Sequence, residues 1–219
     1  MCFSAFASFA AGTGLLAIGA LTVRRVRRRS ELPYAGIPVL FAIQQLIEGA
    51  IWLSFGSVAL PAPALTAAYS FFSHILWPVY VPLAVLLLEP VLWRRNTLLA
   101  LLTGGAAVGL YLLLNMVRFP IVARESGGHI EYLSPHFYAL PVMGGYLAAT
   151  CTSALFSSRG SVRAFGIAAL LSFLGAYAAY AKWFISVWCF FAAVLSVIVL
   201  LHFTGRFQSS KEAAHGMAV

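Results

Sequence analysis

The sequence predicts an all-α fold: a polytopic transmembrane bundle of about seven helices, with its N-terminus outside and its C-terminus in the cytoplasm. Three observations support this prediction. Hydrophobic residues make up 62% of the 219 residues, charged residues make up 9%, and Asp is absent, which exceeds what a water-soluble core can enclose. The apolar stretches reach about 20 residues, enough to cross roughly 30 Å of hydrocarbon. Positive residues gather in alternate connectors, whereas the alternation of β-barrel strands is missing.

Charged residues, Pro and Gly divide the chain into seven expected spans. They lie near residues 3–23, 33–55, 63–88, 96–117, 136–156, 161–181 and 183–204. Only Lys182 separates the last two spans, so a tight turn at the outer interface is expected there. The spans are expected to form one transmembrane domain over residues 1–205, and residues 206–219 a disordered cytoplasmic tail.

The distribution of positive charge orients these spans. No positive residue precedes the first span, whereas five arginines follow it at positions 24–29. We therefore expect a retained span with its N-terminus outside, not a cleaved signal peptide. If the chain crosses the membrane seven times, 11 of its 14 Lys and Arg residues lie on the cytoplasmic side. The three on the outer side are Arg118, Arg124 and Lys182. The net charge of +8 then follows from membrane topology, and no nucleic-acid partner is expected.

The connector over residues 119–135, between the fourth and fifth spans, has its own secondary-structure signal. Short apolar segments flank Gly127 and Gly128, and glycine readily adopts the positive φ angles of a tight hairpin turn. The sequence predicts a short extracytoplasmic β-hairpin here. An irregular loop is the alternative.

Two spans carry polar side chains at a depth where lipid makes them costly. In the second span Gln44 and Glu48 lie one turn apart on one face, and in the third span His74 and Trp77 lie one turn apart beside Pro78. Because Glu48 and His74 lie at comparable depths, they are able to meet.

These side chains are interpreted as the lining of an outward-opening polar pocket within the membrane, which binds or translocates a small ligand, a proton or a metal ion. The predicted ligand-binding residues are Gln44, Glu48, His74, Trp77, Asn115 and Cys189. In the alternative interpretation, Glu48 and His74 only form hydrogen bonds between helices and so stabilise the bundle.

Cys2 becomes the N-terminal residue if the initiator Met is removed. Its amine and thiol would then lie on one carbon, which makes it a candidate catalytic nucleophile and, with His74 and His136, a candidate ligand of a transition-metal ion. The alternative is a small interfacial residue without a chemical role. A retinal cofactor is not expected, because Lys182 lies at the outer end of the last span and not at its middle.

Four segments together resemble an uncharacterised bacterial family of small polytopic membrane proteins that begin Met-Cys-Phe-Ser-Ala. They are residues 1–9 (MCFSAFASF), 44–49 (QQLIEG), 74–78 (HILWP) and 185–191 (ISVWCFF). The resemblance covers nearly the whole chain. It implies a multi-pass protein of the bacterial cytoplasmic membrane, and it supplies no activity.

Three functions remain open from the sequence. The first is a binding or transport protein that uses the polar pocket. The second is a membrane-embedded enzyme or metal-site protein that uses Cys2 with a nearby His, and the third is an accessory subunit or assembly factor of a membrane complex. Whether the chain is an enzyme is therefore left undecided. The expected partners are the lipid bilayer, a small molecule or ion, and either a second copy of the chain or another membrane subunit.

Overall fold

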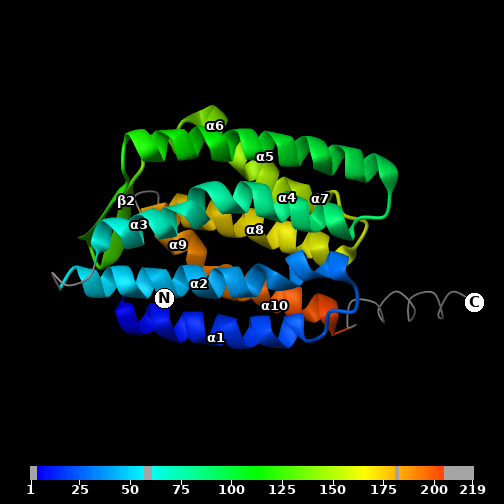
Figure 1. The fold of residues 1–219 in the computed structure, drawn as a ribbon, viewed down its shortest axis with the longest axis horizontal. Helices are drawn as coiled ribbons and strands as arrows, with labels where there is room; N and C mark the ends of the chain where they lie inside the picture. The colour runs from blue at the N-terminus through cyan, green and yellow to red at the C-terminus, as the bar shows by residue number, and fades with distance from the viewer. Residues whose placement is uncertain (1–3, 57–60, 181–182, 205–219) are drawn as a thin grey trace, which may run out of the picture.

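The computed structural model describes residues 4–56, 61–180 and 183–204. In this part of the chain seven helical segments run side by side, and a β-hairpin lies at one end of them (Figure 1). The predicted turn at Lys182 and the predicted tail 206–219 lie outside the described residues.

Several helical segments are interrupted and are given in pieces. The first two are α1 (Ala5–Val23) and α2 (Leu32–Ser54). The third consists of α3 (Ala62–Ser70), a π-helix (Phe71–Leu76) and α4 (Trp77–Leu88), and the fourth is α5 (Leu92–Arg118). After the hairpin, α6 (Leu140–Leu147), a second π-helix (Ala148–Thr152) and α7 (Ser153–Leu155) form the fifth segment. The last two are α8 (Gly160–Tyr180), and α9 (Phe184–Phe190) with α10 (Ala192–Phe203).

Six of the described segments are long and apolar enough to cross a membrane, so the protein is a multi-pass membrane protein. Their bounds agree with the predicted spans within a few residues. The fifth segment, Leu140–Leu155, is shorter, about 24 Å at the helical rise of 1.5 Å per residue. It begins later than the predicted span 136–156, because the backbone amides of Phe137 and Tyr138 close turns after the hairpin and Pro141 occupies the first helical turn.

The predicted β-hairpin is confirmed. Strands β1 (Val122–Ser126) and β2 (His129–Leu133) pair antiparallel, and the turn between them has φ angles of 61° at Gly127 and 75° at Gly128. Two successive positive φ angles are typical of the type I′ turn, whose twist matches that of the strands. Across the strands, Arg124 Nε donates to Glu131 Oε2 at 2.7 Å, and this contact raises the pKa of the Arg124 guanidinium.

Replacing Gly127 with Ala is expected to loosen the hairpin by about 1–2 kcal/mol, because a side chain at this positive φ is strained. The added Cβ would also lie 3.0 Å from Trp183 Cζ2. Hydrogen exchange of the strand amides measures the effect. The control is Gly128→Asn, which has open space around it and a residue that tolerates positive φ. Equal exchange rates in the two variants would count against this account of the turn.

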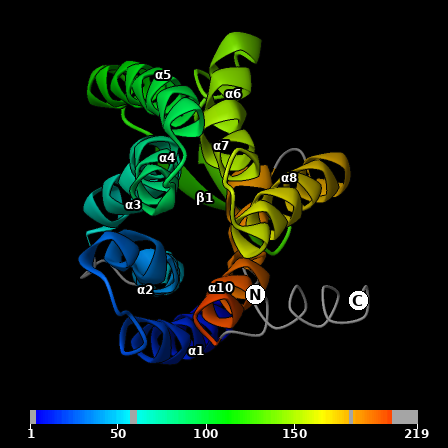
Figure 2. The ribbon, with the colours of Figure 1, turned by 90° about the vertical axis from the view of Figure 1, so that its right-hand side faces the viewer.

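Glycines allow the closest helix approaches. Along the α1–α2 contact, a Cβ on Gly12 would collide with Leu46 and one on Gly19 with Val39. Between α5 and α4, a Cβ on Gly105 would overlap the backbone carbonyl oxygen of Pro78. Figure 2 views the helices nearly end-on, with α1 and α5 on opposite sides of the bundle. These glycine contacts therefore attach the two outer helices to the interior.

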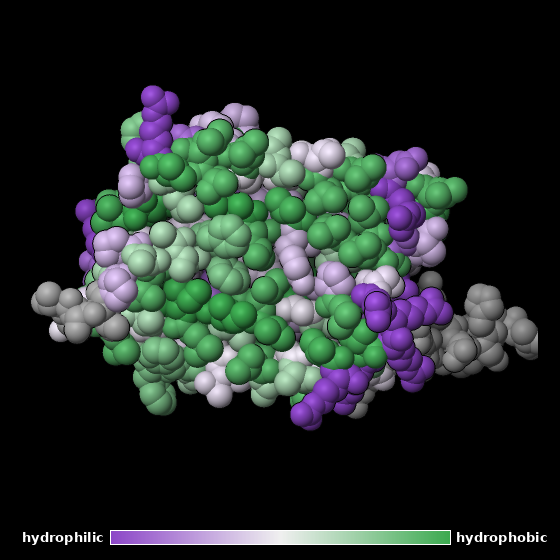
Figure 3. Space-filling view, viewed as in Figure 1, coloured by the Kyte–Doolittle hydropathy of each residue, from purple (hydrophilic) through white to green (hydrophobic). Residues whose placement is uncertain are grey.

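The surface is divided into a hydrophobic middle and two hydrophilic ends (Figure 3). Large apolar side chains such as Leu110, Leu114 and Leu171 are more than half exposed along the middle. Water would disfavour this much apolar surface, whereas lipid solvates it. The arginine-rich α1–α2 connector lies at one end of the bundle and the β-hairpin at the other (Figure 1).

Candidate functional site

A cavity of about 140 Å³ with both polar and apolar side chains in its lining, here called the polar cavity, lies at the hairpin end of the bundle. The π-helix after α3, the C-terminal turns of α5 and the two segments that flank the hairpin form its walls. Its lining includes three residues predicted from the sequence, His74, Asn115 and His136. The volume is enough for several water molecules. The fold thus brings together three predicted residues that are far apart in the chain.

His74 is almost fully buried at this cavity, with 1% of its surface exposed. Its Nδ1 lies 2.8 Å from Ser73 Oγ, and its Nε2 lies 2.9 Å from Ser134 Oγ. A serine hydroxyl can donate or accept, so either neutral tautomer of the imidazole satisfies both contacts. His74 therefore ties the third helical segment to the chain that leaves strand β2.

The π-helix that carries His74 follows from the local sequence. Pro78 has no amide hydrogen to donate to the His74 carbonyl, and its ring crowds that carbonyl. The chain widens over Phe71–Leu76, which ends two residues before this proline, as helices do where the regular ladder of hydrogen bonds is interrupted. The Ser73 carbonyl accepts a hydrogen bond of 2.6 Å from Tyr146 Oη of α6. The widened turn is thus fixed from two sides, by Ser134 and by Tyr146.

A second group of predicted residues joins α2 to its neighbours. Gln44 Oε1 accepts a hydrogen bond of 2.8 Å from Trp77 Nε1 of α4. Glu48, which is fully buried, accepts hydrogen bonds from Gln45 Nε2 at 3.0 Å and from Ser186 Oγ of α9 at 2.7 Å. Within the described residues, His74 hydrogen bonds to Ser73 and Ser134 and not to Glu48. These hydrogen-bond partners of Glu48 and of His74 therefore differ.

The cysteine predictions fall on parts that the structure does not describe. Cys2 lies outside the described residues, and Cys189 lies in α9 but its side chain is not described. Over residues 4–56, 61–180 and 183–204, no three or more His, Cys, Asp or Glu side chains gather in a way that could hold a metal ion. The metal site of Cys2, His74 and His136 and the enzyme hypothesis therefore stay predictions, as does the accessory-subunit hypothesis.

Several residues around His74 were not predicted. Ser134 contacts the imidazole, Met116 lines the cavity, and Ser73 and Tyr146 hold the π-helix. Only Ser134 had a usable sequence signal, because it follows the second apolar segment of the predicted hairpin and lies two residues before His136. Met116 had none, because a methionine near a helix end is ordinary in an apolar bundle.

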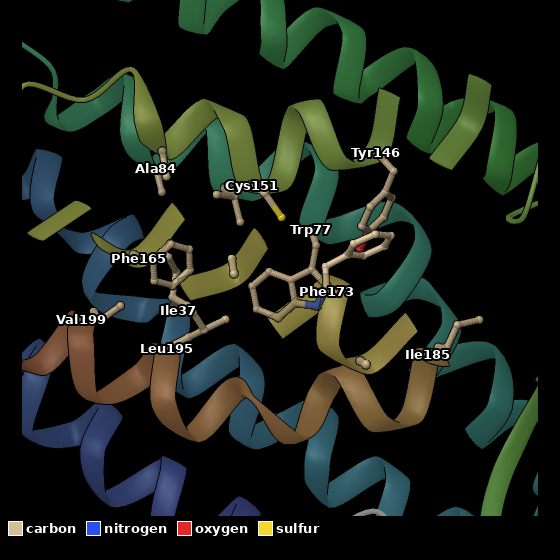
Figure 4. Packing of buried hydrophobic residues seen from close by; sticks show 14 of the residues in the cluster. Ile37, Trp77, Ala84, Tyr146, Cys151, Phe165, Phe173, Ile185, Leu195 and Val199 are labelled. Atoms are coloured by element: carbon tan, nitrogen blue, oxygen red, sulfur yellow. The ribbon is translucent and has the colours of Figure 1, made fainter. Parts of the chain in front are cut away.

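A smaller, apolar cavity of about 50 Å³ lies deeper in the bundle. Trp77, Cys151 and Tyr146 point toward one another in this interior (Figure 4). Ser73 and Tyr146 line this cavity, and His74 lines the polar one. The hydrogen bonds that link Ser73 to His74 and Tyr146 therefore lie between the two cavities.

Comparison with known proteins gives a family without an activity. Residues 1–215 match a family described as a family of unknown function (DUF6629). No curated protein and no solved structure matches this chain.

Proposed function

Because the chain belongs to this family of unknown function, we propose its function from its own geometry: the protein binds a small polar ligand at the hairpin end of its transmembrane bundle. One observation carries the proposal. His74, Asn115 and His136, from three separate parts of the chain, line one cavity of about 140 Å³. Polar side chains that converge on a cavity in an apolar bundle are typical of a ligand site, because lipid makes them costly elsewhere.

The polar groups favour a neutral, hydrogen-bonding solute over a metal ion. Both ring nitrogens of His74 already have a serine hydroxyl as partner, so a metal ion would have to displace one of them. The Asn115 amide nitrogen donates to the Tyr111 carbonyl at 2.8 Å. In the described part of the chain its amide oxygen has no donor, so it can accept a hydrogen bond from a ligand. His136 is half-buried beside Phe119 and supplies a second imidazole.

The proposed orientation places this pocket on the extracytoplasmic side. The arginines at positions 24–29 and Arg159 gather at the other end of the bundle, and positively charged connectors stay in the cytoplasm. The N-terminus then lies outside and the C-terminus inside, in a membrane that we infer to be the bacterial cytoplasmic membrane. A solute would reach the pocket from outside through the hairpin end.

Native mass spectrometry of gently purified full-length protein tests the proposal. His136→Ala is expected to lower the retention of a bound small molecule by about tenfold, which is the effect of losing one good hydrogen bond. The matched control is His129→Ala, since His129 stacks on Trp183 with ring centroids 4.7 Å apart and belongs to the hairpin. This control is expected to retain the ligand as the unchanged protein does.

Accessibility gives a second readout that does not require the ligand to be known. In a background in which Cys2, Cys151 and Cys189 are replaced by Ser, the His136→Cys variant is expected to react with a membrane-impermeant thiol reagent applied from outside. The control variant Thr150→Cys, at a buried position in the second π-helix, is expected to stay unreacted. A ligand-free mass together with an unreactive His136→Cys variant would contradict the proposal and favour a purely structural role for these side chains.

A further inference from the structure

The end of the bundle opposite the hairpin holds a large open cleft of about 760 Å³. The α1–α2 connector, the segment before α8 and the C-terminal end of α10 form its walls. Five arginines line it, namely Arg24, Arg25, Arg27, Arg28 and Arg159. This site shares no residue with the pocket at the hairpin end.

Within the described residues, no ion pair balances the positive charge of this cleft. The single carboxylate in its lining is Glu31, whose Oε2 accepts the backbone amides of Arg27 at 3.1 Å and Arg28 at 3.2 Å. The Glu31 carboxylate thus binds the backbone of the α1–α2 connector and not a guanidinium group of the cleft. Among the described residues, none of the five guanidinium groups forms an ion pair with a carboxylate. A cleft with this excess of cationic donors attracts an anion.

Membrane topology alone does not account for this arrangement. The positive-inside tendency explains why arginines gather at one end of the bundle, and other arginines at that end have a structural task. Arg94, Arg95 and Arg163 donate to backbone carbonyls of Phe156, Leu86 and Ser157 at helix ends. The arginines of the cleft instead line one volume from two parts of the chain, four from the α1–α2 connector and Arg159 from the segment before α8.

We propose that this cleft binds a phosphate group of an anionic ligand at the membrane surface. The planar guanidinium presents paired donors that match phosphate oxygens, and basic pockets between transmembrane helices suit anionic headgroups. The chain's own residues after Thr204 are poorly suited to supply the negative charge that such a ligand would bring. Their sequence contains Arg206, Lys211 and Glu212, so they bring more positive than negative side-chain charge. A lipid headgroup and a soluble phosphate ester share the required chemistry.

The experiment compares two probes on purified full-length protein. One is phosphatidylglycerol added to phosphatidylcholine nanodiscs, and the other is inorganic pyrophosphate in detergent solution. Native mass spectrometry counts retained lipid, and the thermal midpoint reports stabilisation by pyrophosphate. The test variants are the double substitution Arg24→Gln with Arg28→Gln and, separately, Arg159→Gln. The control is Arg29→Gln, an exposed arginine of the same connector that is not part of the cleft lining.

Arg159→Gln is expected to bind the phosphate probe about tenfold more weakly, because one hydrogen bond to a charged group is lost, and the double variant is expected to bind it more weakly still. Arg29→Gln is expected to bind as the unchanged protein does. Retention of phosphatidylglycerol that depends on the cleft arginines identifies a lipid headgroup as the occupant. Stabilisation by pyrophosphate alone with the same dependence identifies a soluble phosphate. Binding of neither probe, or equal loss in Arg29→Gln, would overturn the proposal.

Discussion

Replacing Gly105 with Ala is expected to destabilise the bundle by about 3 kcal/mol, at the upper end of the usual cost of overpacking. The new Cβ would overlap the carbonyl oxygen of Pro78 and lie 2.9 Å from Ala149 Cβ. A backbone carbonyl cannot rotate away as a flexible side chain can, so α5 and α4 must separate. Pro78 lies two residues after the end of the π-helix that carries His74, and this separation is therefore expected to disturb the polar pocket as well.

The thermal midpoint of the purified protein in mild detergent measures this effect. Gly104→Ala is the matched control, because Gly104 is the preceding residue of the same helix and has no atom within 4 Å of an added Cβ. Alanine has the better helix propensity, so the control is expected to be neutral or stabilising by up to about 1 kcal/mol. Equal losses of stability in the two variants would show that the α4–α5 contact is not the reason that position 105 is glycine.

The membrane spans could be predicted because they follow from local composition. A stretch of apolar residues must be helical in lipid, and the charged connectors mark where each helix ends. The hairpin was predicted for a similar reason, because Gly127 and Gly128 supply the two positive φ angles of its turn. The start of the fifth segment was missed by a few residues, since the sequence does not distinguish an apolar turn before Pro141 from a first helical turn.

The candidate site was less predictable because it depends on tertiary contacts. The spacing of His74 and Trp77 assumes 3.6 residues per turn, but the π-helix over Phe71–Leu76 shifts this phase. His74 consequently hydrogen bonds toward the hairpin end, to Ser134, while Trp77 hydrogen bonds to Gln44 of α2. Asn115 and His136 were expected near the outer surface. The sequence grouped Asn115 with His74 as pocket lining and His136 with His74 as candidate metal ligands. That all three line one cavity beside the hairpin could not be derived, because no local pattern specifies which helix packs there.

Glu48→Ala is the second substitution for which we expect a large effect, a loss of about 2–3 kcal/mol of stability. The substitution removes the acceptor of the Gln45 amide and the Ser186 hydroxyl in a fully buried setting, and buried donors that lose their acceptor cost about 1–3 kcal/mol each. Other polar groups within the membrane can accept hydrogen bonds from these two donors, so the total loss of stability is smaller than the sum of the two costs. Glu48→Gln keeps an acceptor oxygen and is expected to lose less than about 1 kcal/mol. The control is Glu125→Ala, an exposed hairpin residue, which is expected to leave the thermal midpoint unchanged.

The Glu48 series also decides which of its two interpretations holds. If Glu48 serves only to join α2 to α9, the Glu48→Gln variant keeps both its stability and any ligand that His136→Ala releases. If Glu48 belongs to the ligand site, as the helical spacing predicts, Glu48→Gln loses the ligand at nearly unchanged stability. The second result would mean that the ligand or its proton reaches beyond His74 and Ser73 toward α2. Loss of stability in Glu48→Gln as large as in Glu48→Ala would instead show that the negative charge itself holds these helices together.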